Sequence, residues 1–242
     1  MPPGACAGGI AVVIDVLRAS TTIITALAHG AAGVRPVADV ASARELAGRL
    51  GPVALLGGER GAVRIEGFDC GNSPLEYTRE RVAGREVVIT TTNGTAALAA
   101  CLKAQEILVA AVVNRAAAAA ACRTLARVAG CDAVHLVCAG TDGQVTAEDV
   151  LAAGGILEAA ARDPASAGDR LDPAAIAARD RWREVVAAAG DEPRAAIIGE
   201  FRRSLGGANL VALGMDDDLI AAAALDALAV VPRFDRASGR LG

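Results

Sequence analysis

The chain has 242 residues, of which 53% are hydrophobic and only 2% aromatic, and its formal net charge is −4. This length suits one large domain or two small ones with a full hydrophobic core, built mainly from Val, Leu, Ile and Ala. A nucleic-acid-binding surface needs a basic patch, so the negative charge argues against that class and favours a small-molecule partner.

Nothing in the sequence indicates secretion or a membrane span. No segment approaches the roughly 20 apolar residues that a membrane helix requires, and Asp15 interrupts the first apolar run where a signal peptide would continue. The six cysteines include no CxxC pair, which is typical of a reduced compartment. We therefore expect a cytoplasmic protein.

Short apolar runs alternate with helical segments along the first half of the chain. Residues 11–14 form a continuous β-branched run that predicts a strand buried on both faces, and residues 23–29 after it have helical character. The same alternation predicts strands at 34–40, 53–56, 87–90 and 107–112, and helices at 41–50, 94–103 and 116–128. A long loop covers residues 61–74.

The second half begins with a predicted strand at 134–138, and Thr146 and Asp149 form a capping signal for a helix at 146–162. The charged segment 163–193 predicts a surface helical excursion in which Trp182 serves packing rather than a lid. Helices at 199–213 and 216–228 precede the closing strand at 230–231.

This order of elements predicts an α/β fold with three α/β/α layers and a mostly parallel or mixed sheet. We expect a single domain over residues 1–242, or two closely packed halves with a boundary near residues 115–130.

Polar residues follow the first strand, and ligands of open α/β sheets bind beyond the carboxyl ends of the strands. Hydroxyls and N–H groups at the start of a helix can hold an anion, with which Arg18 can pair bidentately. Helix capping by Ser20 or Thr21 is the alternative, but the nearby Asp and Arg favour a functional role. The candidates are Asp15, Arg18, Ser20, Thr21 and Thr22.

A second polar loop joins the strand at 87–90 to the next helix. Gly94 permits a turn there, and successive N–H groups can form a nest for an anion, although an ordinary Asn-Gly turn is the alternative. The candidates are Thr91, Thr92, Asn93, Gly94 and Thr95.

A third group follows the strand at 53–56. Glu59 could help to hold a divalent cation and Arg60 could neutralise a second anionic group, while Asn72 and Ser73 lie in the loop beyond. A loop salt bridge is the alternative, and it is favoured for Asp69.

Further acids occur near helix starts. Asp142, Glu148 and Asp149 follow the strand at 134–138, and hard oxygen ligands of this kind suit Mg²⁺. Interaction with the helix dipole explains acids at these places equally well, and we favour it for Glu148 and for the three aspartates at 216–218.

The chain lacks three known phosphate-handling motifs. It contains no G-x-x-x-x-G-K-[ST] loop, no Cys-x₅-Arg loop after a strand, and no second Asp two positions after Asp15. Nucleoside triphosphate hydrolysis and haloacid dehalogenase or Cys-phosphatase chemistry are therefore disfavoured.

Six motifs in order resemble those of the 2-phosphosulfolactate phosphatase family, and the resemblance extends over nearly the whole chain. They are Asp15-Val-Leu-Arg-Ala-Ser-Thr-Thr22, Gly58-Glu-Arg-Gly61, Gly67-Phe-Asp-Cys-Gly-Asn-Ser-Pro74, Thr91-Thr-Asn-Gly-Thr95, Cys138-Ala-Gly140 and Val231-Pro-Arg-Phe234. The family usually has an additional β-segment before the strand that leads into the first motif, where this chain has only about ten residues.

The resemblance implies a Mg²⁺-dependent α/β phosphatase that hydrolyses 2-phosphosulfolactate to sulfolactate and phosphate, a step in coenzyme M synthesis. Our hypothesis is that Asp15 and Glu59, with Asp149, hold Mg²⁺ and that a bound water attacks the phosphoryl group. Arg18, Arg60 and the 91–95 loop would stabilise its charge. In a competing version Asp15 is the nucleophile and forms an acyl phosphate.

Two other functions stay open. Cys138 could be the nucleophile of an isochorismatase-like hydrolase with Asp15 as its base, or the loops could form a non-catalytic anion-binding module. The broad alanine-rich helical faces are compatible with homo-oligomerisation but fix no stoichiometry.

Overall fold

The computed structural model of the chain describes residues 4–141 and 143–242. Its strands are β1 (Ile10–Ile14), β2 (Gly33–Pro36), β3 (Ala54–Arg60), β4 (Val63–Arg64), β5 (Glu86–Thr90), β6 (Glu106–Ala110), β7 (Val134–Cys138), β8 (Phe234–Asp235) and β9 (Arg240–Leu241). Its α-helices are α1 (Ala19–Ala28), α2 (Val40–Leu50), α3 (Arg79–Val82), α4 (Gly94–Ala100), α5 (Arg115–Ala129), α6 (Ala147–Ala160), α7 (Pro173–Ala188), α8 (Pro193–Arg203), α9 (Leu205–Ala212) and α10 (Asp216–Ala222).

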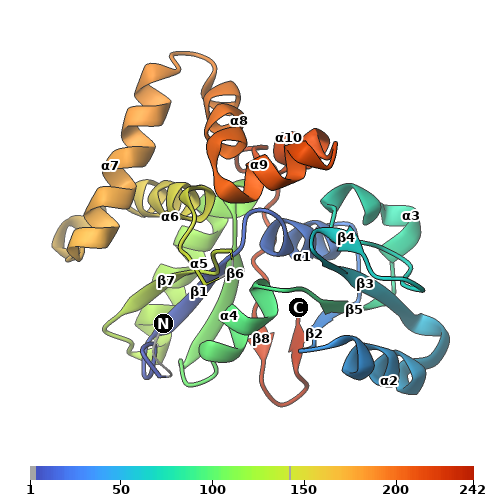
Figure 1. The fold of residues 1–242 in the computed structure, drawn as a ribbon. Coiled ribbons are helices and arrows are strands. Elements are labelled where there is room, and N and C mark those ends of the chain that lie inside the picture. The colour runs from blue at the N-terminus through green and yellow to red at the C-terminus, as the bar shows by residue number, and fades with distance from the viewer. Residues whose placement is uncertain (1–3, 142) are drawn as a thin grey trace.

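The strands form two sheets, with β1, β6 and β7 in the left half of the view in Figure 1 and β2, β3 and β5 in the right half, and α1 contacts β6 of the one and β2 of the other. One sheet has the order β6-β1-β7 and is parallel throughout. The other has the order β4-β3-β5-β2-β9-β8, in which β3, β5 and β2 are parallel and the remaining pairs antiparallel. The predicted α/β class with mixed strands is confirmed, although the strands are divided between two sheets.

The C-terminal hairpin β8–β9 joins the two sheets. Strand β9 pairs with β2, while the N–H of Val109 in β6 donates to the carbonyl of Pro232 at 3.0 Å. After helix α10 the chain thus returns to the strands, and its C-terminal segment bridges the two sheets.

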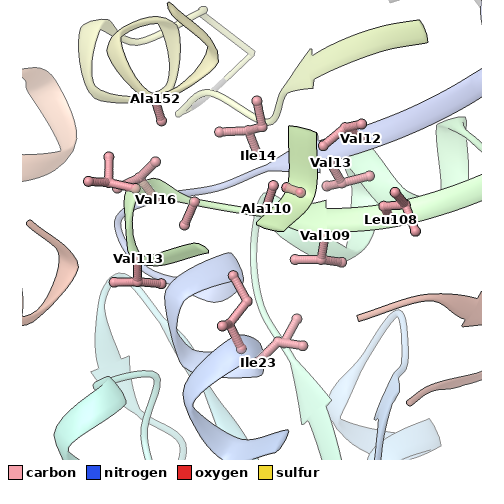
Figure 2. Close-up of a cluster of buried hydrophobic side chains, with 14 of the residues drawn as sticks. Val12, Val13, Ile14, Val16, Ile23, Leu108, Val109, Ala110, Val113 and Ala152 are labelled. Atoms are coloured by element: carbon pink, nitrogen blue, oxygen red, sulfur yellow. The ribbon is translucent and has the colours of Figure 1, made fainter. Parts of the chain in front are cut away.

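All five residues of β1 are buried, as expected for a β-branched strand covered on both faces. Side chains from β1, β6 and α1 belong to the core shown in Figure 2, to which Val13 of β1, Val109 of β6 and Ile23 of α1 contribute. This packing fixes the position at which β1 ends, and therefore the position of Asp15.

Several element boundaries differ from those predicted. Strand β3 continues through Gly57 and Gly58 to Arg60, because Gly58 adopts a φ of 143° and a side chain there would collide with the Thr90 carbonyl. Ser204, in extended conformation, separates α8 from α9 within the predicted single helix 199–213. The predicted strand at 230–231 is wrong, since β8 begins only at Phe234.

Helix α7 belongs to the predicted surface excursion, and Trp182 within it is 3% exposed. Its ring packs where Gly155 of α6 leaves room, and the Arg115 guanidinium lies 5.3 Å from the ring centroid. The structure therefore agrees with a packing role for Trp182.

None of the helices among the described residues combines the length and the apolar character that a membrane crossing requires.

Candidate active site

Asp15 follows β1 directly and is 8% exposed. The Ala19 N–H donates to its Oδ1 at 3.3 Å, while Oδ2 lies 2.8 Å from the position that a Cβ on Gly94 would occupy. The carboxylate therefore lies against the first residue of α4. The expected meeting of Asp15 with the Thr-Asn-Gly loop is observed, although the two come from different sheets.

Glu59, at the end of β3, connects two loops at this place. Its Oε1 accepts from the N–H and the hydroxyl of Thr92, at 2.8 and 3.0 Å, and its Oε2 accepts from the N–H of Ala62 at 2.8 Å. The side chain is 7% exposed and its charge acts on Asp15. Glu59 is thus part of the site, and both of its oxygens already hold backbone groups.

Asp149 and Glu148 enter the site from the first turn of α6. Asp149 accepts from the N–H groups of Val16 and Gly140, each at 2.9 Å, so it fastens the segment after β1 to the segment after β7. Thr146 occupies the N-cap position, but its side chain makes no capping bond, and its buried Oγ1 has no hydrogen-bond partner within the part of the chain that the structure describes. The capping signal predicts where the helix starts, but it does not predict that Asp149 binds these two N–H groups.

Glu148 is 3% exposed and its Oε2 is buried without a hydrogen-bond partner among the described residues. A side chain on Gly206, at the start of α9, would collide with its Oε1. Placement by the helix dipole alone does not explain a buried carboxylate with an unpaired oxygen. Asp142, the third acid of this predicted group, lies outside the described residues.

The acids repel one another in a site with little solvent. Burial, followed by the charges of Glu59 and Glu148, raises the pKa of Asp15 to about 7, although Arg18 and the Ala19 N–H oppose the shift. Burial and the charge of Asp15 likewise raise the pKa of Asp149 well above its ordinary value. Such clusters are typical of functional sites and favour a cationic ligand.

Arg18 is 4% exposed and lies among three acceptors from two other segments. Its Nη1 donates to Asp218 at 2.7 Å and to the Met215 sulfur at 3.1 Å, and its Nη2 donates to the Ala62 carbonyl at 2.6 Å. The preceding peptide bond, Leu17–Arg18, is cis. Arg18 therefore lies in the site, as expected, but with a carboxylate partner from α10.

The helix-dipole interpretation of residues 216–218 does not hold for Asp218. It is buried, and besides Arg18 it accepts a 2.5 Å hydrogen bond from the Ser73 hydroxyl. Asp216 instead pairs with Arg202 at 3.3 Å, and Asp217 is exposed. Only the third aspartate of the run belongs to the site.

The hydroxyls of the three residues Ser20, Thr21 and Thr22 form hydrogen bonds with backbone groups. Ser20 accepts from the Asp15 N–H at 2.9 Å, Thr21 donates to the Val16 carbonyl at 2.8 Å, and Thr22 donates to the Asn72 carbonyl at 2.7 Å. The N-cap residue of α1 is Arg18, without a side-chain capping bond, so the capping alternative is wrong. These three residues hold the loop that carries Asp15 and Arg18.

The remaining candidates line the same edge in different ways. Thr91 Oγ1 and Asn72 Oδ1 are buried without a partner among the described residues, whereas Thr95 donates to the Thr91 carbonyl at 2.7 Å. Asn93 precedes α4 half-buried, with no capping bond. Arg60 is exposed and donates to the Thr90 hydroxyl at 3.0 Å.

A metal was expected on Asp15, Glu59 and Asp149. Within residues 4–141 and 143–242, no three or more His, Cys, Asp or Glu side chains are grouped as a metal site would require. Glu59 and Asp149 use both oxygens on N–H groups, whereas Asp15 Oδ2 and Glu148 Oε2 accept no hydrogen bond from the described residues. Two buried, repelling carboxylates with free oxygens fit a hard divalent cation better than the expected set.

Cys138 ends β7, as predicted, and is partly buried. Burial, followed by the charges of Asp149 and Glu148, raises the pKa of its thiol to about 12. A nucleophilic cysteine needs the opposite shift, because the thiolate is the reactive form. The surroundings of Cys138 therefore disfavour the isochorismatase-like alternative.

An α/β fold that gathers buried acids, an arginine and unpaired hydroxyl and amide oxygens at its strand ends is that of an enzyme for small anionic molecules. A family model described as 2-phosphosulpholactate phosphatase matches residues 2–237, and the chain belongs to this family of phosphoric monoester hydrolases.

Relatives named probable 2-phosphosulfolactate phosphatase resemble the chain over most of its length. The protein of Symbiobacterium thermophilum is 43% identical over 237 residues, which cover 96% of this chain and 94% of the relative. The protein of Deinococcus radiodurans is 42% identical over 228 residues, 92% and 86% of the two chains, and that of Gloeobacter violaceus is 40% identical over 227 residues, 92% and 87%.

Proposed function

We propose that the protein hydrolyses 2-phosphosulfolactate, or a closely related phosphorylated hydroxy acid, to the free hydroxy acid and phosphate in a Mg²⁺-dependent reaction. Family membership and the names of the relatives support the reaction. The single observation that carries it is the convergence of Asp15, Arg18 and Thr91 with buried carboxylates at one edge. A substrate with phosphate, carboxylate and sulfonate groups needs such polar partners rather than an apolar pocket.

Asp15 and Glu148 are the residues best suited to hold the cation, because each has an oxygen that accepts no hydrogen bond from the described residues and their like charges need compensation. When bound, Mg²⁺ would polarise a phosphoryl oxygen and lower the pKa of a bound water. Glu59 and Asp149 then act by holding the loops on either side of Asp15. This assignment replaces the sequence-based one, in which Glu59 and Asp149 were ligands themselves.

Arg18 and the Thr91 hydroxyl are suited to the phosphoryl oxygens, where donors that are already oriented stabilise developing charge. Arg60, exposed at the end of β3, can meet a second anionic group of the substrate. Ser20, Thr21 and Thr22 contribute indirectly, since their hydroxyls hold the loop.

The deciding experiment measures phosphate release from 2-phosphosulfolactate and from other small phosphorylated hydroxy acids, with Mg²⁺ or with a chelator. Turnover should require Mg²⁺ and should be abolished in Asp15→Asn. The exposed helix cap Asp39 provides the control, since Asp39→Asn keeps its cap and should leave the rate unchanged. Absence of turnover with every ester, or near-normal release by Asp15→Asn, contradicts the proposal.

Two routes remain for the chemistry. If water attacks the phosphoryl group directly, acid quenching within one turnover of labelled substrate leaves no label on the protein. If Asp15 is the nucleophile, the quenched protein carries label on that residue, as in other covalent phosphoryl transfers. Cys138→Ser should keep full activity in both routes, and loss of activity in it would instead support the thiol mechanism.

A further inference from the structure

The C-terminal helix α10 contributes one buried carboxylate to a site otherwise built from the first 150 residues. Asp218 lies 200 positions after Arg18, and the Arg18–Asp218 pair has side chains only 4% exposed on either side. Asp218 also accepts the 2.5 Å hydrogen bond from Ser73, which precedes the short helical turn Pro74–Glu76. One carboxylate therefore holds two candidate ligand-binding residues from separate loops.

The hydrogen bonds of Arg18 leave part of its guanidinium available. An arginine has five N–H donors, and the bonds to Asp218, Met215 and Ala62 use three of them. Two donors therefore remain for a ligand. A buried guanidinium that lost its carboxylate partner would be an uncompensated charge with a less defined orientation.

We propose that Asp218 is a positioning residue, which holds the Arg18 guanidinium in the orientation that the anionic groups of the substrate require. By accepting the single hydroxyl proton of Ser73, it also fixes the Ser73 loop beside Arg18. This inference rests on the proposed phosphatase function. Helix α10 then completes the site without touching substrate, and its role depends on the third of three consecutive aspartates.

The test compares Asp218→Asn with Asp217→Asn, which makes the same charge change on the adjacent, exposed residue. Asparagine keeps the shape but weakens the charged hydrogen bond to Arg18, so kcat/KM should fall by roughly tenfold to hundredfold. Asp217→Asn should stay within about twofold of the parent. An unchanged kcat/KM in folded Asp218→Asn overturns the inference.

A double-mutant cycle separates positioning from a general structural role. If Asp218 acts through Arg18, then Asp218→Asn should add little to the loss already caused by Arg18→Ala. Millimolar guanidinium ion should partly restore Arg18→Ala, because Asp218 can hold the free cation, and should not restore Arg18→Ala combined with Asp218→Asn. Fully additive losses, or equal rescue of both variants, contradict positioning.

Asp218→Glu keeps the experiment decisive should the asparagine variant fail to fold. It retains the charge but displaces it by one methylene, so kcat/KM should fall while the melting temperature stays close to that of the parent. A parent-like kcat/KM for Asp218→Glu contradicts the need for exact placement.

Failure of the proposed function has a different signature. If the parent protein turns over no phosphate ester, calorimetry with inorganic phosphate still tests Asp218. The inference then requires Asp218→Asn, but not Asp217→Asn, to weaken phosphate binding by at least roughly tenfold, the equivalent of one charged hydrogen bond. Equal phosphate affinity in the two variants contradicts it.

Discussion

At the scale of single residues, the contact between Asp15 and Gly94 links the ends of two sheets. A Cβ at position 94 would lie 2.8 Å from Asp15 Oδ2, 2.8 Å from the Ala19 Cβ and 3.3 Å from Thr91 Oγ1. No real side chain tolerates contacts that short without movement of its neighbours. Glycine is therefore required here for its size, and not for its backbone conformation.

Gly94→Ala should lower kcat by roughly tenfold to hundredfold, because it displaces Asp15 while leaving the chemistry of every side chain intact. Steady-state kinetics measures the effect. The control is Gly48→Ala in α2, where no atom lies within 4 Å of the new Cβ. That variant should keep its kcat and gain about 1 kcal/mol in the free energy of unfolding, from helix propensity. Parent-like kinetics in Gly94→Ala would show that Asp15 does not depend on this contact.

The raised pKa of Asp15 makes stability depend on pH in a defined direction. The unfolded state releases this proton near pH 3.8 and the folded state only near pH 7, so the folded state binds more protons between these values. The contribution of Asp15 to stability is therefore fully present below pH 3.8 and is lost as pH rises through about 7.

Asp15→Asn should consequently gain stability relative to the parent between pH 5 and pH 8 when divalent ions are chelated, since asparagine does not titrate. Urea unfolding of both proteins at the two pH values measures the difference. Comparison with the variant separates Asp15 from Asp149, whose pKa is raised in the same direction. A difference independent of pH would mean that Asp15 is ionised throughout.

The sequence predicted the position of Asp15, Arg18 and Glu59 at one edge because residues directly after buried strands have little freedom in where they lie. It did not predict the burial of Glu148 or Asp218. Acids in the first turn of a helix look the same in a sequence whether they face solvent or a site. Only the tertiary contacts, with Gly206 and with Arg18 respectively, separate these cases.

At the scale of elements, Glu59 connects the turn after β3 to the loop that precedes α4. Glutamine at this position offers only one acceptor oxygen, so its amide group must face the donor N–H of either Ala62 or Thr92. The loop before α4 borders Asp15, and the turn after β3 contacts Arg18 through the Ala62 carbonyl. The carboxylate therefore determines the spacing between β4 and α4.

Glu59→Gln should lower the free energy of unfolding by about 1–3 kcal/mol, because the N–H of either Ala62 or Thr92 loses its hydrogen bond to a buried carboxylate. It should also reduce kcat, as the loops beside Asp15 and Arg18 separate. Denaturant unfolding and kinetics measure the two effects. Glu66→Gln, at an exposed position in the neighbouring loop, should change neither. Equal stability of the two variants would show that Glu59 does not hold the loops.

Elements with strong local signals were predicted well, and those that depend on partners were not. The buried strands β1 and β5, the partly exposed strand β7 and the alanine-rich α5 agree with the expected positions. The two-residue strands β8 and β9 exist only because their partners lie nearby. Sequence periodicity cannot indicate strands of two residues, because an alternation of apolar and polar residues needs a longer run to be recognised.

At the scale of the whole molecule, the division of the strands between two sheets follows from pairing that no local pattern encodes. Strand β6 follows β5 along the chain but pairs with β1 in the other sheet. The C-terminal hairpin then connects both sheets, through β9 with β2 and through Pro232 and Arg233 with β6. Arg233 adds a two-bond ion pair with Glu106, at 2.6 and 2.7 Å.

Leu241 tests whether this hairpin stabilises both sheets together. It is fully buried and pairs with Val34 of β2 and with Phe234 of β8. Leu241→Ala should lower the free energy of unfolding by about 2–5 kcal/mol, as expected for a large-to-small change in a core. Leu102→Ala, at a position 47% exposed, should change it by less than about 0.5 kcal/mol.

Hydrogen exchange shows whether Leu241→Ala destabilises one sheet or both. If the hairpin joins the sheets into one cooperative unit, the amides of β1 and β6 should lose as much protection in Leu241→Ala as those of β2 and β5, because all of them exchange through the same opening. Loss confined to β2 and β5 would mean that the two sheets unfold separately. The bond from Val109 to Pro232 would then be a contact between independent units, and the site between them would depend on α1 and α4 alone for its geometry.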